Sequence, residues 1–320
     1  KKFYVEIISD KRGYKYLKDY RDVKVSIISS STIFKKNFFQ SILSVLIIIY
    51  AIIRSFIFLL FKRPNLIFGM GGYSSFPACV AAKILRIPFI IYENNLCMGK
   101  ANKYLSPYAE RIFVSHKDLE GISEKYKENV IEIGNIIRKE ILNINLKQYS
   151  KLDDNKFKIL ILGGSQAAKA FAEKLPEVFK KCVEANIELK IYQQCLPDQN
   201  EFLSSRYRDL KIKFEIFNFK NNIIDYFQKT NIAITRSGSS MLAELINAKV
   251  PFISIPLPSS ADDHQLKNAI FYKKHNYGYL VKEEDIKVEL FRLISKISNE
   301  KELLNQMINK QRQYSDKSVY

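Results

Sequence analysis

Short apolar runs alternate with longer amphipathic segments along most of the 320 residues. Runs rich in β-branched and aromatic residues, bounded by turn residues, are typical of buried strands, and the segments between them have helical spacing. Strands that alternate with helices favour parallel sheets with right-handed crossovers, so the pattern predicts an α/β fold. The predicted strands cover residues 5–8, 25–28, 66–68, 89–92, 111–114, 130–133, 157–162, 188–193, 211–217, 232–235 and 252–255.

A polar stretch rich in Lys, Asn and Asp interrupts this alternation near the middle of the chain, before a new apolar strand begins at Phe157. Domains typically contain about 100–200 residues, so 320 residues suit two of them. We therefore expect a first domain at 1–146, a linker at 147–156 and a second domain at 157–320. The last 30 or so residues read as amphipathic helix.

Residues 41–61 form the most unusual segment, because 21 residues contain one charge, Arg54, between Lys35 and Lys36 on one side and Lys62 and Arg63 on the other. About 20 apolar residues suffice to cross a bilayer. The strand that follows, however, needs partner strands from both sides of the segment. We expect a helix with one face in the core and an apolar outer face rimmed by cations, suited to an anionic membrane surface. A plain core helix and a true span remain alternatives.

The net charge of +18 is concentrated early, with 13 basic and 4 acidic residues among the first 63. A basic surface attracts nucleic acid, anionic lipid or a phosphorylated substrate, and general Lys-rich usage is the alternative explanation. The hydrophobic content of 47% and the charged content of 26% exclude a disordered or collagen-like chain. Four Cys without a CxxC pair and three His indicate neither a disulfide framework nor a zinc site, and favour a reducing, cytosolic setting.

Two glycine-containing turns follow predicted strands of the second half. In GGSQ (163–166), glycines let backbone N–H groups approach an anion at a helix N-terminus, which suits a phosphate; Ser165 as a simple helix cap is the alternative. In TRSGSSMLAE (235–244), Glu244 lies early in a helix, where a carboxylate can accept two hydrogen bonds from a ribose. Complementing the helix dipole is its alternative role.

Three further strand ends carry polar residues. The segment 256–268 contains Asp262, Asp263, His264 and Gln265, which suit a polar ligand better than a metal, because adjacent residues do not readily converge on one ion. In the first half, GMGGY (69–73) and YENN (92–95) end successive strands. Ser74 occupies the third glycine position of the dinucleotide fingerprint, so neither NAD nor FAD is expected.

Six ordered motifs together resemble the MurG family of N-acetylglucosaminyltransferases over about residues 64–275. They are GMGGY (69–73), YENN (92–95), GNIIR (134–138), GGSQ (163–166), RSG with Glu244, and DHQ (263–265) with Asn268. The resemblance implies a GT-B architecture, in which two Rossmann-like, doubly wound domains face a central cleft. It also implies transfer of N-acetylglucosamine from UDP-N-acetylglucosamine to the 4-hydroxyl of undecaprenyl-diphospho-N-acetylmuramoyl-pentapeptide, with inversion, in peptidoglycan synthesis.

The resemblance also assigns expected roles to residues. Ser165 would contact the donor diphosphate, Arg138 the donor from the linker side, Gln265 the sugar, and Asn95 the reacting centre from the acceptor domain. Glu244 would hold the ribose, and the nucleotide and sugar would be lined by Ser239, Ser240, Met241, Leu242, Ala243 and Glu244. The turns expected to support these contacts contain Gly71, Gly72, Tyr73, Glu93, Gly163, Gly164, Gln166 and Gly238.

Three departures from the family pattern concern the chemistry. A glycine-rich loop with a His near the catalytic base would precede Lys1, so we expect an N-terminally truncated chain whose base is unassigned. Glu93 and His116 are candidates, but structural roles are favoured for both. Tyr92 replaces a common His, and Lys220 stands where an apolar residue often packs near the uracil.

The remaining expectations concern cofactors and partners. No Asp-x-Asp motif is suitably placed, so the resemblance implies a metal-free mechanism without a cofactor, in which backbone amides, the helix dipole and Arg138 meet the leaving-group charge. We expect a peripheral protein on the cytoplasmic face of the bacterial inner membrane, and no nucleic-acid partner. The alternatives are another GT-B transferase with a lipid acceptor, such as a diacylglycerol glucosyltransferase, and an inactive nucleotide-sugar-binding fragment.

Overall fold

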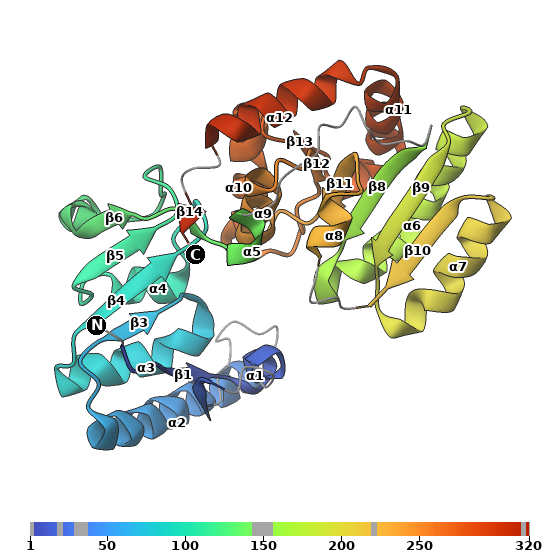
Figure 1. The fold of residues 1–320 in the computed structure, drawn as a ribbon. Coiled ribbons are helices and arrows are strands. Elements are labelled where there is room, and N and C mark those ends of the chain that lie inside the picture. Colours follow the sequence, from blue (N-terminus) through green and yellow to red (C-terminus); the bar gives the residue numbers. More distant parts are fainter. Residues whose placement is uncertain are drawn as a thin grey trace. The chain divides into compact units, whose positions relative to one another are not determined.

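A computed structural model describes residues 3–17, 22–28, 38–142, 156–218, 223–314 and 318–319 (Figure 1). Contacts divide the chain into two compact units, Lys1–Ile133 and Gly134–Tyr320. The sequence-based boundary at residue 146 therefore differs from the division by contacts, which places 134–142 with the second unit. Of the expected linker 147–156, only Lys156 lies within the described residues.

The first unit contains two parallel sheets, one of β1 and β2 and one with the order β3-β4-β5-β6. Side chains of β4 and β5 pack with those of α3, and Leu59 of α2 and Leu105 of α4 join the same core. The elements are β1 (Glu6–Ser9), α1 (Lys11–Leu17), β2 (Lys24–Ile27), α2 (Phe38–Lys62), β3 (Ile67–Gly69), α3 (Gly72–Leu85), β4 (Phe89–Glu93), α4 (Lys100–Leu105), β5 (Arg111–Val114) and β6 (Val130–Glu132).

The apolar segment forms one long helix, α2, with two different faces. Ser44, Ile48, Ala51, Ser55 and Leu59 are at most 8% exposed and recur at the three- and four-residue spacing of a single helical stripe. The opposite side of the helix is largely apolar yet exposed, and it also carries the exposed charges of Arg54 and Lys62. This outer face of α2 contains Ile42, Leu43, Val45, Leu46, Ile49, Tyr50, Ile53, Ile57, Leu60 and Phe61. The helix thus has one buried and one exposed apolar face, as expected.

The second unit contains a parallel six-stranded sheet with the order β10-β9-β8-β11-β12-β13, and a separate pair, β14-β7. The elements are β7 (Asn135–Ile136), α5 (Lys139–Leu142), β8 (Phe157–Leu162), α6 (Gly164–Glu184), β9 (Leu189–Gln194), α7 (Asn200–Asp209), β10 (Lys213–Phe217), α8 (Ile224–Phe227), β11 (Ile232–Thr235), α9 (Ser239–Asn247), β12 (Phe252–Ser254), α10 (His264–Lys274), β13 (Tyr279–Leu280), η5 (Glu283–Asp285), η6 (Ile286–Leu290), α11 (Phe291–Asn299), α12 (Glu302–Tyr314) and β14 (Ser318–Val319).

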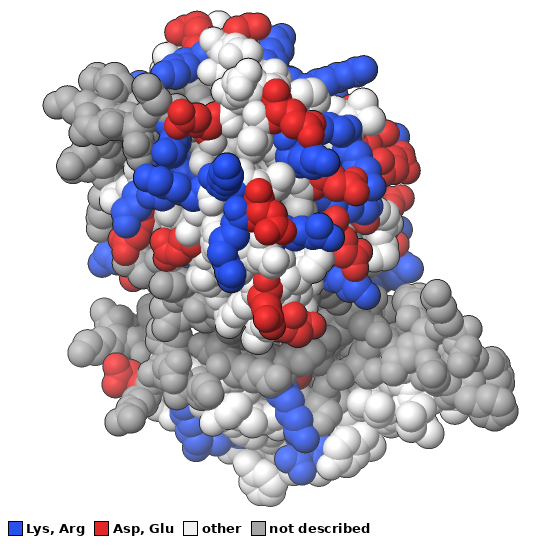
Figure 2. Space-filling view, turned by 90° about the vertical axis from the view of Figure 1, so that its right-hand side faces the viewer, with Lys and Arg blue, Asp and Glu red and all other residues white. Residues whose placement is uncertain are grey.

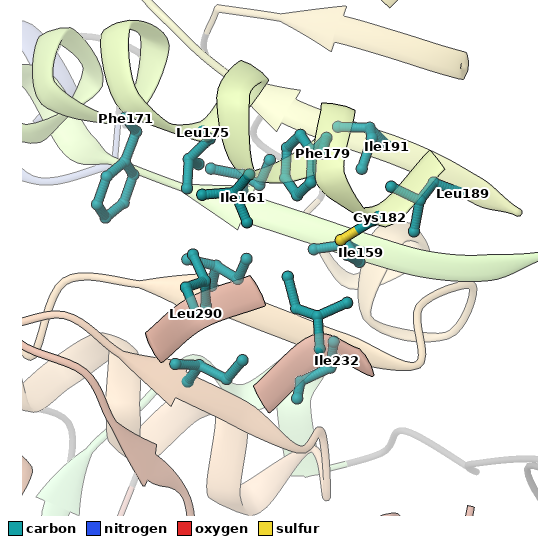
Figure 3. Close-up of a cluster of buried hydrophobic side chains, with 14 of the residues drawn as sticks. Ile159, Ile161, Phe171, Leu175, Phe179, Cys182, Leu189, Ile191, Ile232 and Leu290 are labelled. Carbon is teal, nitrogen blue, oxygen red and sulfur yellow. The ribbon is translucent and has the colours of Figure 1, made fainter. Parts of the chain in front are cut away.

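The central strand β8 is buried on both faces, because its alternate side chains enter two different cores. Ile159 and Ile161 join a cluster with Phe171 and other residues of α6, which Figure 3 shows lying over the strand. Leu160 and Leu162 join a second cluster that includes residues of α9. Helices α6 and α9 therefore cover opposite faces of the same sheet.

Every strand predicted from an apolar run is present, with ends that shift by at most two residues. The amphipathic C-terminal segment forms two helices, α11 and α12. The three two-residue strands β7, β13 and β14 were not predicted, because so short a strand has no apolar run of its own.

Candidate functional site

The strand order of the second sheet reverses between β8 and β11, since β9 and β10 lie on one side of this pair and β12 and β13 on the other. In open α/β sheets, ligands bind at the carboxyl ends of the strands at this switch point. Leu162 and Thr235, the last residues of the two strands, are partners in the ladder. The two glycine-containing turns predicted from the sequence, 163–166 and 236–239, are thus brought next to each other.

The first of these turns leads directly into α6. Gly163 is the residue before the helix, and Gly164 is its first residue, so Ser165 is not the N-cap. The first backbone N–H groups of α6 have no partner within the helix, as at any helix start, and the helix dipole favours an anion there. The side chains of Ser165 and Gln166 lie outside the described residues, so their predicted contacts stay predictions.

The second turn leads into α9, and the beginning of this helix carries the residues that were predicted to line the nucleotide and the sugar. Gly238 precedes the helix, and Ser239 begins it. Leu242 and Ala243 are fully buried in the core, so neither side chain is available to a ligand. Met241 is partly buried and Ser240 is exposed. Glu244 is 8% exposed and is the one carboxylate among the residues predicted from this turn.

Glu244 forms an ion pair with Arg138. Nε of Arg138 donates to Oε1 of Glu244 at 2.9 Å, and Nη2 donates to Oε2 at 2.5 Å. This two-pronged geometry is the strong form of an arginine–carboxylate pair. The structure therefore brings together two residues to which the sequence analysis gave separate donor contacts.

The segment that carries Arg138 is attached to α9 at a second point. Oγ of Ser239 donates to Oδ1 of Asn135 at 3.2 Å, and both side chains are buried. Asn135 belongs to β7, which pairs with β14 in the second unit. The GNIIR motif thus positions the start of α9, although sequence reasoning gave no role to its asparagine.

The loop between β12 and α10 is also tied to this turn. Oε1 of Gln265 accepts the backbone N–H of Leu257 at 3.0 Å, and Nδ2 of Asn268 donates to the carbonyl of Ser237 at 3.1 Å. Asp262 and Asp263 have φ values of 51° and 53°, in the left-handed region. Both residues lie in the turn directly before α10, and non-glycine backbone in this region often clusters at functional sites.

In the first unit, the predicted turn residues surround one carboxylate. Glu93 is 4% exposed and accepts hydrogen bonds from the backbone and side chain of Asn95, the backbone of Gly99 and the side chain of Asn102, at 2.9–3.1 Å. Both oxygens are engaged, which favours the structural role expected for Glu93. Asn102 also donates to the carbonyl of Tyr92 at 3.0 Å, and sequence reasoning did not single it out.

The GMGGY turn requires its glycines. Gly71 and Gly72 have φ values of 76° and 70°, which side chains rarely adopt. A Cβ at Gly71 would also lie 3.1 Å from the carbonyl oxygen of Tyr92. Tyr73 is partly buried, and Tyr92 is 4% exposed with its ring stacked against Phe68. The two predicted turns of the first unit are therefore neighbours.

Two further residues singled out from the sequence are His116 and Lys220. His116 is 6% exposed, which agrees with its expected structural role, and Lys220 lies outside the described residues. Within the described part of the chain, no group of three or more His, Cys, Asp and Glu side chains is arranged to hold a metal ion.

Comparison with known proteins identifies the family. Residues 1–114 match the glycosyltransferase family 28 N-terminal domain, and residues 158–319 match the glycosyltransferase family 28 C-terminal domain. A Pelagibacter ubique protein named UDP-N-acetylglucosamine--N-acetylmuramyl-(pentapeptide) pyrophosphoryl-undecaprenol N-acetylglucosamine transferase is 35% identical, over 94% of this chain and 84% of its own length. A Rickettsia bellii protein of the same name is 32% identical, over 95% and 86%. The chain belongs to the MurG family.

The solved structures agree with this assignment. The crystal structure of Acinetobacter baumannii MurG superposes with a TM-score of 0.72 at 25% identity, over 96% of this chain and 85% of that one. The family assignment and the two parallel-sheet units make the fold a GT-B architecture, as the resemblance to the MurG family implied.

Proposed function

We infer that this MurG family member transfers N-acetylglucosamine from UDP-N-acetylglucosamine to the 4-hydroxyl of undecaprenyl-diphospho-N-acetylmuramoyl-pentapeptide, converting lipid I to lipid II in peptidoglycan synthesis. The observation that carries this inference is the pair of turns at the switch point of the second sheet. One turn offers backbone N–H groups at the start of α6, and the other offers Glu244. An anion site beside a buried carboxylate suits a diphosphate joined to a ribose.

The second unit is thus the donor domain. We assign the diphosphate to the N-terminus of α6, with Ser165 and Arg138, and the ribose hydroxyls to Glu244. Gln265 is assigned to the sugar hydroxyls. Its Oε1 accepts from the backbone of Leu257, which orients the amide. Asn95 and the turns around Glu93 and Gly71 are assigned to the acceptor domain.

The reaction is a direct displacement. The acceptor 4-hydroxyl oxygen attacks the anomeric carbon, the bond from that carbon to the UDP oxygen breaks with inversion, and the hydroxyl proton passes to a base. UDP leaves with its bonding electron pair. We assign the stabilisation of its negative charge to the N–H groups of α6 and the Arg138 guanidinium, without a metal ion.

The same proposal includes a peripheral position on the cytoplasmic face of the membrane, where a lipid-linked acceptor would be found. By length and composition, α2 is the one helix among the described residues that could cross a membrane. Lys62 at its end pairs with Glu6 of β1 at 3.3 Å, so segments before and after the helix lie in one compact unit. This supports a helix that lies on the membrane with its exposed apolar face.

The charge distribution supports a membrane partner over nucleic acid. In the upper part of the face drawn in Figure 2, acidic and basic side chains are interspersed. The ion pairs Lys180–Glu184 and Lys287–Glu177 are examples of such mixed charge in the second unit. By contrast, Arg54, Lys62 and Arg63 on and after α2 are exposed beside an apolar face.

A transfer assay tests the proposal. The chain is incubated with UDP-N-acetylglucosamine and either a muramyl-pentapeptide diphosphate lipid or diacylglycerol, and the products are separated by mass. Transfer to the muramyl lipid alone is expected. Transfer to diacylglycerol would instead identify a lipid glycosyltransferase of another kind. If calorimetry detects UDP-N-acetylglucosamine binding but neither acceptor reacts, the chain is a nucleotide-sugar-binding fragment.

A further inference from the structure

Arg236, the first residue after β11, is buried and makes contacts to several neighbouring elements. Its Nη1 donates to the carbonyl oxygens of Ile255 and Pro256 at 3.3 and 3.2 Å, directly after β12. Its Nη2 donates to Oε2 of Glu283 at 2.5 Å. Its guanidinium carbon lies 4.7 Å from the ring centre of Phe171 on α6. Figure 3 shows Phe171 among the side chains of α6 that face the sheet.

Glu283 is held from a second direction by α6. Nζ of Lys174 lies 3.2 Å from both Oε1 and the backbone oxygen of Glu283. The three charged side chains therefore form a chain, Arg236–Glu283–Lys174, in which one carboxylate bridges two cations. Its side chains are 9%, 19% and 31% exposed, so solvent screens these interactions less than those of a surface pair.

The elements joined in this way are those that carry the proposed donor contacts. Helix α6 starts at the proposed diphosphate site, the turn after Arg236 leads to Ser239 and Glu244, and the loop after Pro256 leads to Gln265. A guanidinium presents its donors in a fixed planar fork, so it can fix the relative position of several carbonyl and carboxylate groups. Lysine, with one flexible ammonium group, cannot reproduce that fork.

We propose that Glu283, which lies outside every recognised motif, is a positioning residue of the donor site and acts through Arg236. Glu283 sets the orientation of the guanidinium, and the guanidinium in turn sets the spacing between the β11 turn and the β12 loop. This proposal rests on the assignment of donor binding to the second unit. It goes further, because it extends the donor site to an acidic residue 47 positions beyond Arg236.

The test measures the dissociation constant for UDP-N-acetylglucosamine and the midpoint of thermal unfolding on the full 320-residue chain. The variants are Glu283→Ala, the isosteric Glu283→Gln, and Arg236→Lys. The matched control is Glu177→Ala, because Glu177 also bridges α6 to the segment after β13, through Lys287 at 2.7 Å, but without contact to Arg236. A second control is Tyr207→Phe, which removes a buried hydrogen bond to Gln193 elsewhere in the same domain.

We expect Glu283→Ala and Arg236→Lys to raise the dissociation constant about tenfold, Glu283→Gln to raise it less, and both controls to leave it within twofold. The double variant Glu283→Ala with Arg236→Lys should have a dissociation constant no higher than that of the single variant that binds the donor less tightly, because both changes break the same chain of contacts. A fall in the unfolding midpoint with unchanged affinity would overturn the proposal. Failure of the unaltered chain to bind the donor would instead contradict the proposed function.

Discussion

Arg138 and Glu244 lie 106 positions apart in the chain, yet their guanidinium and carboxylate groups form a two-pronged ion pair. The carboxylate that we assign to the ribose is therefore already occupied by the guanidinium that we assign to the diphosphate. Donor binding then requires an exchange of partners, in which Arg138 turns to the diphosphate and Glu244 to the ribose hydroxyls. The pair keeps the buried carboxylate satisfied until the donor replaces it.

This exchange predicts opposite effects on two ligands. In Arg138→Met, UDP-N-acetylglucosamine should bind about tenfold or more weakly, because a hydrogen bond between charged groups is lost. Uridine, which has no phosphate, should bind as well as before or more tightly, because Glu244 no longer has a competing partner. Calorimetry with both ligands measures the difference, and Arg292→Met, at an exposed position, is the control. Equal weakening of both ligands would contradict the exchange.

A substitution at Glu93 distinguishes a structural role of this carboxylate in the first unit from a part in the reaction itself. Glu93→Gln replaces one acceptor oxygen with an NH2 group that faces existing donors, so we expect the first unit to lose about 2–3 kcal/mol of stability. Denaturant unfolding measures this loss, and Glu124→Gln, whose side chain is 85% exposed, is the control. Donor binding by the second unit should persist. Unchanged stability with a large fall in kcat would show that Glu93 takes part in the reaction itself.

The sequence predicted those parts of the fold that local pattern determines. Apolar runs identified the strands of both large sheets, apart from the two-residue β13, and the turns after β8 and β11 were recognised because glycines follow apolar strands. Contacts between distant residues could not be predicted in the same way. Nothing local to Arg138 indicates that Glu244 faces it, and Glu283 lies in an ordinary acidic stretch, KEED. Only tertiary packing brings these charges together.

We also expect the Glu283 carboxylate to make the stability of the folded chain depend on pH in the acidic range. Burial alone raises the pKa of its carboxyl, but the hydrogen bonds and charges of Arg236 and Lys174 outweigh burial and lower the pKa below its usual value. A carboxyl whose pKa is lower in the folded than in the unfolded chain stabilises the fold above the unfolded value of about 4.3. That contribution is lost as the pH falls through the lower, folded value.

The measurement compares the free energy of unfolding of the unaltered chain and Glu283→Gln between pH 7 and pH 3. The variant should be less stable at pH 7, and the difference should shrink below about pH 4. Glu284→Gln, an exposed neighbour in the same η5 turn, should show no such convergence. A difference that stays constant down to pH 3 would show that the charge of Glu283 does not stabilise the fold.

We expect a substitution at Gly278, directly before β13, to cause a packing defect at the edge of the six-stranded sheet. A Cβ at this position would lie 2.1 Å from Cε2 of Phe252, whose ring is fully buried. Because the ring has little room to move, Gly278→Ala should cost about 1–3 kcal/mol of stability. Gly238→Ala is the comparison, since a Cβ there meets nothing within 4 Å and φ is −69°. Denaturant unfolding should separate the two variants, and equal stabilities would mean that β12 shifts to admit the methyl group.

The outer face of α2 predicts how the protein associates with membranes. Leu46 and Ile53 are 57% and 52% exposed on this face, and replacing both with Asn should lower binding to phosphatidylglycerol vesicles at least tenfold, because two apolar side chains no longer enter the bilayer. Val288→Asn, at an exposed apolar position of the second unit, should not change binding.

Salt distinguishes a helix that lies on the membrane from one that spans it. If cations beside the outer face of α2 contribute to the attraction to anionic lipid, high salt should weaken vesicle binding and phosphatidylcholine vesicles should bind less well. A spanning helix would behave differently, since it would stay with the vesicles at high salt and would be released only by detergent. Release by salt would therefore support a helix that lies on the surface, and retention would require the segments on either side of α2 to separate across the bilayer, against the contact between Glu6 and Lys62.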